Sequence, residues 1–440
     1  MRFFGREDEI SELRRIRMLS HDTARLTVVT GRRRVGKTEL VKQALKSEND
    51  LFVYLLITRQ KEATLCDGLQ HEIESTGISV LGKAQKFTDL LRIVFKAAIE
   101  RPVTLVIDEF QEFDRINPAV FGEMQGLWDE FQHVAKINLV VCGSVNRLMN
   151  KIFFNYGEPL YGRNTGHLKL RPFRPSVLKE ILASYKSNYT PDDLLALWTF
   201  TGGVARYVQL LLDGRALSRK AMLDYIFSPS SPFIEEGKTL LAEEFGGEYG
   251  TFFSILSSVA SGHNTFGELS SCVGADVGTY LARLEGDYGI LGKIVPAYDK
   301  DRSRNSHYVL EDCFLRFWFR FVFKYRSWIE MERTDELKAH VSANLRTFEG
   351  FALERYFRAK FVEEKRYTSI GGWWDRKGAN EIDLVCEDEL TGSLDIYEVK
   401  REAKRYDENA LKLKAEAFFA KNPAKRELKV SYAGLSLEDV

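Results

Sequence analysis

A glycine-rich octapeptide near the N-terminus carries the clearest chemical signal in the sequence. It follows the pattern GxxxxGK[ST] and consists of Gly31, Arg32, Arg33, Arg34, Val35, Gly36, Lys37 and Thr38. Glycines let backbone amides turn inward around phosphate groups, and the start of a following helix favours negative charge. We therefore expect the lysine to reach the β- and γ-phosphates of ATP and the threonine to bind Mg²⁺, with Glu39 beside them.

An apolar run that ends in two carboxylates supplies the complementary chemistry. Residues 105–107 are Leu-Val-Ile, and Asp108 and Glu109 follow directly. Carboxylates at the end of a buried strand can bind Mg²⁺ and polarise a water molecule. We expect Asp108 to associate with the metal and Glu109 to act as the general base, with Gln111 as a weaker candidate for contact with nucleotide or water. The alternative is a solvated acidic strand end.

Two later positions are candidates for sensing the γ-phosphate. Another apolar run ends at Ser144, where a polar side chain can contact phosphate or orient the attacking water. Asn146 is the alternative to Ser144, and a simple turn is an equally good interpretation. Arg163 is either a finger that reaches the nucleotide of a neighbouring copy, which would imply a homo-oligomer, or a surface arginine.

A second set of charged residues occupies the last sixth of the chain. Asp383 lies in one apolar run, and Glu398 and Lys400 lie two apart in the next, so alternation puts the latter two on one face of a strand. The two carboxylates can hold Mg²⁺, while the lysine activates water or stabilises charge on a phosphate. On a preceding helix Glu349 is the expected further carboxylate, with Glu354 as the alternative. The structural alternative is a solvated acidic strand and a surface hairpin.

Alternating strand and helix patterns predict the elements that position the first set. The strand-like segments are residues 26–30, 51–58, 103–107, 137–142 and 168–170. Helical patterns between them are typical of a parallel sheet. Residues 175–245 are helical, and residues 249–310 give three short helices, with Thr265 and Asp276 as N-caps of the second and third, and then two strands. That order is typical of a winged helix.

The C-terminal third is predicted to position the second set. An aromatic stripe from Phe314 to Tyr325 has helical spacing and is more typical of a core than of a ligand site. The predicted elements that follow are a helix at 345–360, strands at 368–374, 381–385 and 394–400, a helix at 407–420 and a strand at 428–433. Residues 387–389 are expected in a charged turn, and Trp373 and Trp374 under the sheet rather than stacked on a base.

Composition limits the classes of partner. Lys+Arg and Asp+Glu number 63 each, so net charge attracts neither nucleic acid nor membrane. Contact with DNA would need local patches, such as Arg401, Lys404 and Arg405, which a solvated helix start explains equally well. The five cysteines form no CxxC pair, and no apolar run suits a signal peptide or a membrane span. We therefore expect a cytoplasmic protein.

Taken together, the N-terminal motifs resemble the archaeal-type ATPases of the AAA+/STAND branch. The motifs are residues 4–7 (Phe-Gly-Arg-Glu), the octapeptide, residues 106–111, residues 142–144, residues 161–163 and residues 201–203 (Thr-Gly-Gly). The resemblance continues through the winged helix and implies that Arg6 and Glu7 lie near the nucleotide. Where the family often has a proline, this chain has Val204-Ala205, so no sensor is assigned to Arg206 or Tyr207.

The C-terminal pattern resembles the PD-(D/E)xK nuclease superfamily, whose core is a helix, three strands, a helix and a fourth strand. The expected fold is α/β. It comprises a parallel-sheet P-loop ATPase core (1–174), a helical lid (175–245), a winged helix (246–312), a helical connector (313–344) and a restriction-endonuclease-like domain (345–440). The resemblance implies an ATP-hydrolysing protein that controls a Mg²⁺-dependent DNA nuclease. The alternative is a nucleotide-dependent switch or scaffold that acts through protein partners without cleavage.

Overall fold

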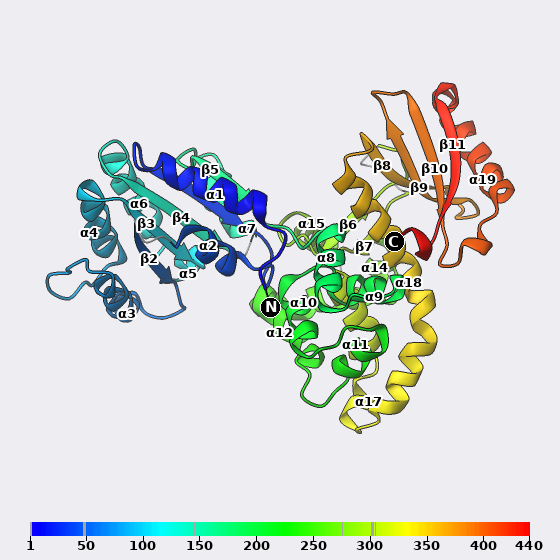
Figure 1. Ribbon diagram of the computed structural model, residues 1–440, viewed down its shortest axis with the longest axis horizontal. Helices are drawn as coiled ribbons and strands as arrows, with labels where there is room; N and C mark the ends of the chain where they lie inside the picture. Colours follow the sequence, from blue (N-terminus) through cyan, green and yellow to red (C-terminus); the bar gives the residue numbers. More distant parts are fainter. Residues whose placement is uncertain (1, 47–49, 145, 275, 301–302, 304) are drawn as a thin grey trace. The chain divides into compact units, whose positions relative to one another are not determined.

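The structure, a computed structural model, describes residues 2–440 apart from 47–49, 145, 275, 301–302 and 304. The chain separates into two compact units, residues 2–171 and residues 172–440 (Figure 1). The predicted division into five parts stays a prediction.

The N-terminal unit contains a five-stranded, fully parallel sheet in the order β2-β3-β4-β1-β5. Its strands are β1 Arg25–Thr30, β2 Leu51–Leu56, β3 Val103–Asp108, β4 Ile137–Gly143 and β5 Gly166–Lys169. The central strands β3 and β4 are buried at every position, as expected for parallel strands covered on both faces. The predicted parallel sheet is confirmed, and β5 begins two residues before its predicted start.

Helices cover both faces of this sheet. They are α1 Glu7–Leu19, α2 Lys37–Leu45, α3 Glu62–Ser75, α4 Phe87–Glu100, α5 Phe113–Ile116, α6 Ala119–Phe131 and α7 Asn146–Phe154, with a 3-10 turn η1 at Phe110–Glu112. Residues of α1 and α2 form a core with Val29, Val106 and Val140 on one face. Helices α3, α4, α6 and α7 form the larger core with Val28 and Leu105 on the other face. The alternation of side chains along each strand thus divides the hydrophobic residues between two layers.

The second unit begins with helices. They are α8 Pro175–Tyr185, α9 Pro191–Thr201, α10 Ala205–Asp213, α11 Arg219–Ile226, α12 Phe233–Phe245, α13 Tyr249–Ala260, α14 Phe266–Val273 and α15 Gly278–Gly286. An antiparallel pair follows, β6 Leu291–Ile294 and β7 His307–Leu310. Thr265 forms the predicted N-cap of α14, as part of a capping box with Glu268. The N-cap of α15 is Val277 instead of Asp276, whose carboxylate accepts a hydrogen bond from the amide of Gly278.

The aromatic stripe forms the helical turn α16 Cys313–Phe317 and the π-helix η3 Trp318–Phe323, followed by α17 Arg326–Glu330. Its buried members include Phe314, Phe317 and Phe321, so the predicted core is confirmed. The next helix, α18, runs without interruption from Thr334 to Glu364. The predicted start at residue 345 is therefore wrong, because the helical periodicity of residues 334–344 belongs to the same helix.

The C-terminal sheet has the order β11-β10-β9-β8. Its strands are β8 Ser369–Trp374, β9 Glu381–Asp388, β10 Ser393–Val399 and β11 Lys429–Leu435, with α19 Glu408–Lys421 packed on one face. Strands β10 and β11 are parallel and the other pairs are antiparallel. The predicted order of helix, three strands, helix and strand is confirmed, and Trp373 and Trp374 are buried as predicted.

The predicted charged turn at residues 387–389 is wrong at its first two residues. Strand β9 continues to Asp388, and Glu387 is buried within it. The carboxylate of Glu387 is 2.6 Å from the ammonium of Lys425 and accepts a hydrogen bond from the hydroxyl of Tyr298. A partner 38 residues away in the chain thus stabilises a carboxylate whose local sequence is typical of a turn.

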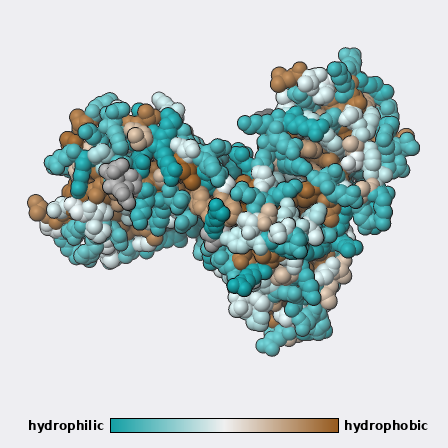
Figure 2. Space-filling view, viewed as in Figure 1, coloured by the Kyte–Doolittle hydropathy of each residue, from teal (hydrophilic) through white to brown (hydrophobic). Residues whose placement is uncertain are grey.

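Hydrophilic residues predominate on the visible face of each unit, and hydrophobic ones are scattered among them (Figure 2). Within the described residues, no helix is both long and apolar enough to cross a membrane.

Candidate functional site

The octapeptide forms a loop between the end of β1 and the start of α2. Gly31 has a φ of +152°, and a Cβ at that position would lie 2.6 Å from the carbonyl oxygen of Leu170. Gly36, which precedes the helix, has a φ of +97°. Side chains rarely tolerate such backbone angles, so both glycines are required for the loop to close over the helix N-terminus.

Lys37 is buried inside this loop. Its ammonium donates hydrogen bonds to the carbonyl oxygens of Gly31 (2.8 Å) and Arg32 (3.2 Å). Burial lowers the pKa of Lys37, while the nearby carboxylates of Glu109 and Asp108 act in the opposite direction. The loop therefore holds a desolvated cation next to two carboxylates, which is the charge arrangement that a phosphate–metal ligand requires.

Thr38 and Asp108 meet at the end of β3. The threonine hydroxyl donates to Asp108 Oδ2 at 2.7 Å, and the hydroxyl of Tyr54 donates to the same oxygen at 2.6 Å. Burial, followed by the hydrogen bond to Asp108, raises the pKa of Tyr54. Sequence reasoning missed Tyr54. The available signal was a hydroxyl within the apolar strand β2, two residues before Leu56, which pairs with Asp108.

Glu109 lies beside the residues that were predicted to act with it. Its backbone has a φ of +55°, and its Oε2 accepts hydrogen bonds from the hydroxyl of Ser144 (2.9 Å) and from the amide of Gln111 (2.5 Å). The Ser144 hydroxyl is thus bonded to the candidate base. The alternative candidate, Asn146, cannot be set against Ser144, because its side chain lies outside the described parts of the chain.

The remaining predicted residues of this unit form other contacts. Arg163 forms an ion pair with Asp129 (2.8 Å) and donates to the carbonyl of Pro159, so within the described contacts it is held by its own chain. Arg6 is buried and donates to the carbonyl of Arg171, directly after β5. The nucleotide contacts predicted for Arg163 and Arg6 stay predictions.

The C-terminal set comes together where β9 begins and the antiparallel β10 ends. Glu398 Oε1 lies 2.7 Å from the ammonium of Lys400 and 3.0 Å from that of Lys414. Burial alone would raise the pKa of Glu398, but the hydrogen bonds and charges of these two lysines outweigh burial and lower it. Asp383 Oδ2 accepts a hydrogen bond from the amide of Val399 at 2.6 Å. Burial raises the pKa of Asp383, and Lys400 partly counteracts this.

Glu354, not Glu349, is the helix carboxylate that interacts with Asp383. Glu354 lines a cleft of about 530 Å³ together with Glu381, Asp383 and Arg355. Burial and the charges of Asp383 and Glu381 raise the pKa of Glu354 to about 8. The placement thus favours Glu354 over Glu349 as the helix carboxylate of this cleft, and its catalytic role stays a prediction.

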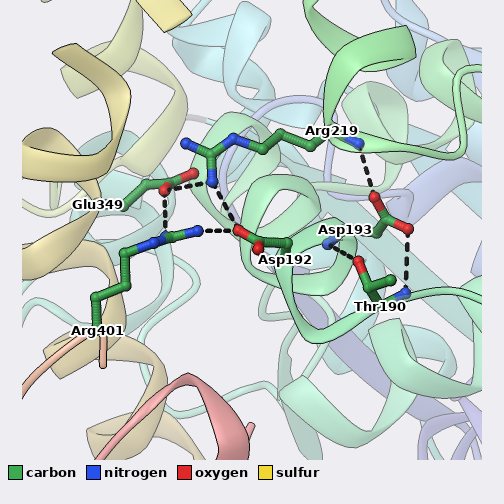
Figure 3. Close-up of polar contacts among 6 residues, drawn as sticks. All are labelled: Thr190, Asp192, Asp193, Arg219, Glu349 and Arg401. Carbon is green, nitrogen blue, oxygen red and sulfur yellow. Dashed lines mark hydrogen bonds and ion pairs between the residues drawn. The ribbon is translucent and has the colours of Figure 1, made fainter. Parts of the chain in front are cut away.

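Glu349 instead belongs to a buried ion network in the same unit (Figure 3). It is 1% exposed and lies 3.0 Å from Arg219 and 2.6 Å from Arg401. Both arginines also pair with Asp192 at the start of α9. Arg401, which was a candidate for DNA contact, thus links the segment after β10 to α9 and α18.

Replacing Glu354 with glutamine is expected to remove a pH dependence of stability. A carboxyl whose pKa is raised by folding contributes stability that is fully present below its unfolded pKa and is lost as the pH rises through its folded pKa. For Glu354 that window runs from 4.5 to about 8, at roughly 1.4 kcal/mol per pKa unit. Urea unfolding should find Glu354→Gln equal to the unmodified chain at pH 5 and more stable at pH 8.5. The exposed Glu364→Gln on the same helix should show neither effect.

Comparison with known proteins gives two matches along the chain. Residues 3–211 match the model of an ATPase domain predominantly from Archaea, and residues 318–411 match a family described as archaeal and bacterial proteins of unknown function. An uncharacterized protein of Methanocaldococcus jannaschii is 28% identical over 418 residues, which cover 90% of this chain and 87% of that protein.

Two solved structures share the fold. The Walker-type ATPase of Pyrococcus abyssi is 17% identical and covers 72% of this chain and 96% of its own, with a TM-score of 0.53. The ORC2 protein of Aeropyrum pernix in its ADPNP-ADP complexes is 16% identical and covers 77% of this chain and 95% of its own, with a TM-score of 0.51. The match of residues 3–211 identifies an ATPase domain in this part of the chain, and residues 31–38 form its glycine-rich loop between β1 and α2.

Proposed function

We propose that the ATPase domain binds ATP together with Mg²⁺ and hydrolyses it. The observation that carries this proposal is the hydrogen bond between Thr38 and Asp108, directly beside the buried ammonium of Lys37. A hydroxyl and a carboxylate are oxygen ligands of the kind that Mg²⁺ prefers. The two residues would hold the ion, which on binding neutralises charge on the phosphate oxygens.

The roles of the other residues follow from their contacts. Lys37 now bonds to carbonyl oxygens of its own loop, and it would exchange these for the phosphate oxygens of ATP. Glu109 would accept a proton from the attacking water. Its bonds to Ser144 and Gln111 fix the carboxylate, so a change at Ser144 on nucleotide binding would reorient the base. The nucleotides named for the Aeropyrum pernix structure support the choice of ATP.

The test is ATP binding and hydrolysis by the full chain with Lys37→Ala. We expect binding to weaken at least tenfold and hydrolysis to fall with it, because a buried cation that contacts phosphate is lost. Lys96→Ala, an exposed lysine on α4, is the matched control and should keep both properties. Unchanged binding in Lys37→Ala would refute the proposed nucleotide site.

We propose as a second function that the C-terminal cleft hydrolyses phosphodiester bonds of DNA. Asp383 and Glu354 support it because both line the cleft, and Lys400 supports it because its charge acts on both carboxylates. The sheet topology, with α18 before the strands and α19 between β10 and β11, also fits the resemblance to PD-(D/E)xK nucleases.

The second function is not supported by a preformed metal site in the described part of the chain. Among the described residues, no group of three or more His, Cys, Asp or Glu side chains is placed to hold a metal ion. Glu398, one of the two predicted metal ligands, is bound by Lys400 and Lys414. The proposal therefore rests on the cleft and its charged groups, and the alternative is a scaffold that binds without cleaving.

Cleavage assays with Asp383→Ala separate these alternatives. Plasmid, linear and branched DNA would be incubated with the full chain and Mg²⁺ or Mn²⁺, with and without ATP. Nicking that falls at least tenfold in Asp383→Ala, but not in the Glu389→Ala control at an exposed position, would support a nuclease. No nicking by the unmodified chain, with ATP hydrolysis intact, would favour the scaffold.

A further inference from the structure

A polar pocket in the second unit is lined by two arginines, and no acidic residue lines it with them. The pocket has a volume of about 360 Å³ and lies between the end of α13, the segment α16–η3 and α18. Arg316 and Arg320 line it together with Asn344, Thr347 and Phe348. Within the described part of the chain, neither guanidinium forms an ion pair, and the lining contains no acidic residue.

The position of Arg316 is fixed by two aromatic rings. Its guanidinium lies 3.9 Å from the centre of the Phe351 ring and 4.8 Å from that of Phe348. Arg320 follows one turn later in the π-helix η3. Such helices are rare and are frequent at functional sites. Between Cys313 and Phe323 these two arginines are the only charged residues, so an otherwise apolar segment directs two cations into one pocket.

An arginine in this setting calls for an anion. Withdrawing a charge from water is costly unless an opposite charge or hydrogen bonds compensate. Burial lowers the pKa of Arg316 to about 10, the neighbouring Arg355 and Arg320 act in the same direction, and the charge of Glu354 only partly opposes them. The rings supply part of the compensation through cation–π contact. They leave the hydrogen-bonding edge of the guanidinium to a ligand, and a planar guanidinium matches the oxygens of phosphate.

The pocket and the cleft of Asp383 lie along one face of α18. Asn344, Thr347 and Phe348 line the pocket, while Phe351 and Glu354 line the cleft. These positions are three or four residues apart, which places them in one row on the helix. Thr347 and Glu354 are seven residues apart, so about 10 Å of helix axis separates the two. This is a distance that a nucleic-acid strand spans in a few nucleotides.

We propose that Arg316 and Arg320 bind a phosphate group of a nucleic-acid strand that continues along α18 to the cleft of Asp383. The choice of a strand as the source of the phosphate rests on the second proposed function. None of the residues that line the pocket lines the cleft of Asp383, so binding at the pocket can be measured in a chain that does not cleave.

The test is binding of a fluorescent single-stranded DNA oligonucleotide to the full chain, followed by anisotropy at several salt concentrations. All variants carry Lys37→Ala, so that the P-loop does not bind phosphate, and Asp383→Ala, so that no cleavage occurs. With Arg316→Gln and Arg320→Gln, we expect affinity to fall at least tenfold and the slope of log K against log salt to decrease, because phosphate contacts are lost. Arg326→Gln with Arg333→Gln, an equal change of charge at exposed positions, is the control.

The outcomes are separable. Loss of binding in the arginine variant but not in the control supports the proposal, and Arg320→Gln alone, at an exposed position, should give a smaller loss without a folding defect. Equal binding by all variants overturns it. If pyrophosphate binds through the two arginines but no oligonucleotide binds, the proposed nucleic-acid strand is refuted. The pocket would then bind a small phosphate compound. Strand binding through the arginines stands even if the Asp383→Ala comparison finds no nuclease.

Discussion

Glu109→Gln is expected to slow ATP hydrolysis by on the order of 10²–10⁴-fold, the contribution typical of a general base. ATP binding should be retained, because Lys37, Thr38 and Asp108 keep their contacts. Glutamine has nearly the same shape and can still bond to Ser144, so the variant removes the proton acceptor and little else. The measurement is steady-state hydrolysis beside equilibrium ATP binding.

Two further variants give this result its meaning. Glu100→Gln, at the exposed end of α4, controls for the change of charge. This variant should bind and hydrolyse ATP like the unmodified chain. Ser144→Ala removes one of the two hydrogen bonds to the carboxylate. If Ser144 only holds the Glu109 carboxylate in place, Ser144→Ala should slow ATP hydrolysis much less than Glu109→Gln does. Hydrolysis by Glu109→Gln at the unmodified rate would instead assign the proton transfer to another group.

Much of the N-terminal site was predictable because parallel strands impose their own geometry. A buried parallel strand is a continuous apolar run, and the polar residues after such runs meet at one edge of the sheet. Asp108, Glu109 and Ser144 follow two runs of this kind, and they do meet. Arg163 follows no such rule, since it lies in a loop, and its partner Asp129 is on α6.

The C-terminal residues were harder to predict because helices and long-range pairs are less constrained. Glu349 and Glu354 are five residues apart, so they point to different sides of one helix, and only the packing of α18 decides which side faces β9. The periodicity of a helix gives its faces but not the neighbour of each face. Glu387 likewise became part of a strand through Tyr298 and Lys425, contacts that no local pattern contains.

Arg401→Ala is expected to lower the free energy of unfolding of the second unit by about 3 kcal/mol, the scale for breaking a buried ion pair. Glu349 is almost completely buried, and in the described structure its Oε1 already has no hydrogen-bond partner. Without Arg401, Arg219 would remain as the ion-pair partner at 3.0 Å, with Arg346 acting on Glu349 only through its charge. Arg405→Ala, whose partner Glu402 and whose own side chain are exposed, should change stability by less than about 0.5 kcal/mol.

The pH dependence of this effect identifies Glu349 as its cause. Burial raises the pKa of Glu349 to about 7, so the stability linked to its protonation is complete at pH 4.5 and is lost as the pH rises through 7. Removing Arg401 raises that pKa further, because a cation that favours the carboxylate is gone. Urea unfolding should therefore show a larger loss at pH 8 than at pH 5.5, and Glu349→Gln in the same chain should recover part of it. An equal loss at both pH values would mean that Arg401 stabilises the unit through its packing and its contact with Asp192 on α9, without the buried charge of Glu349.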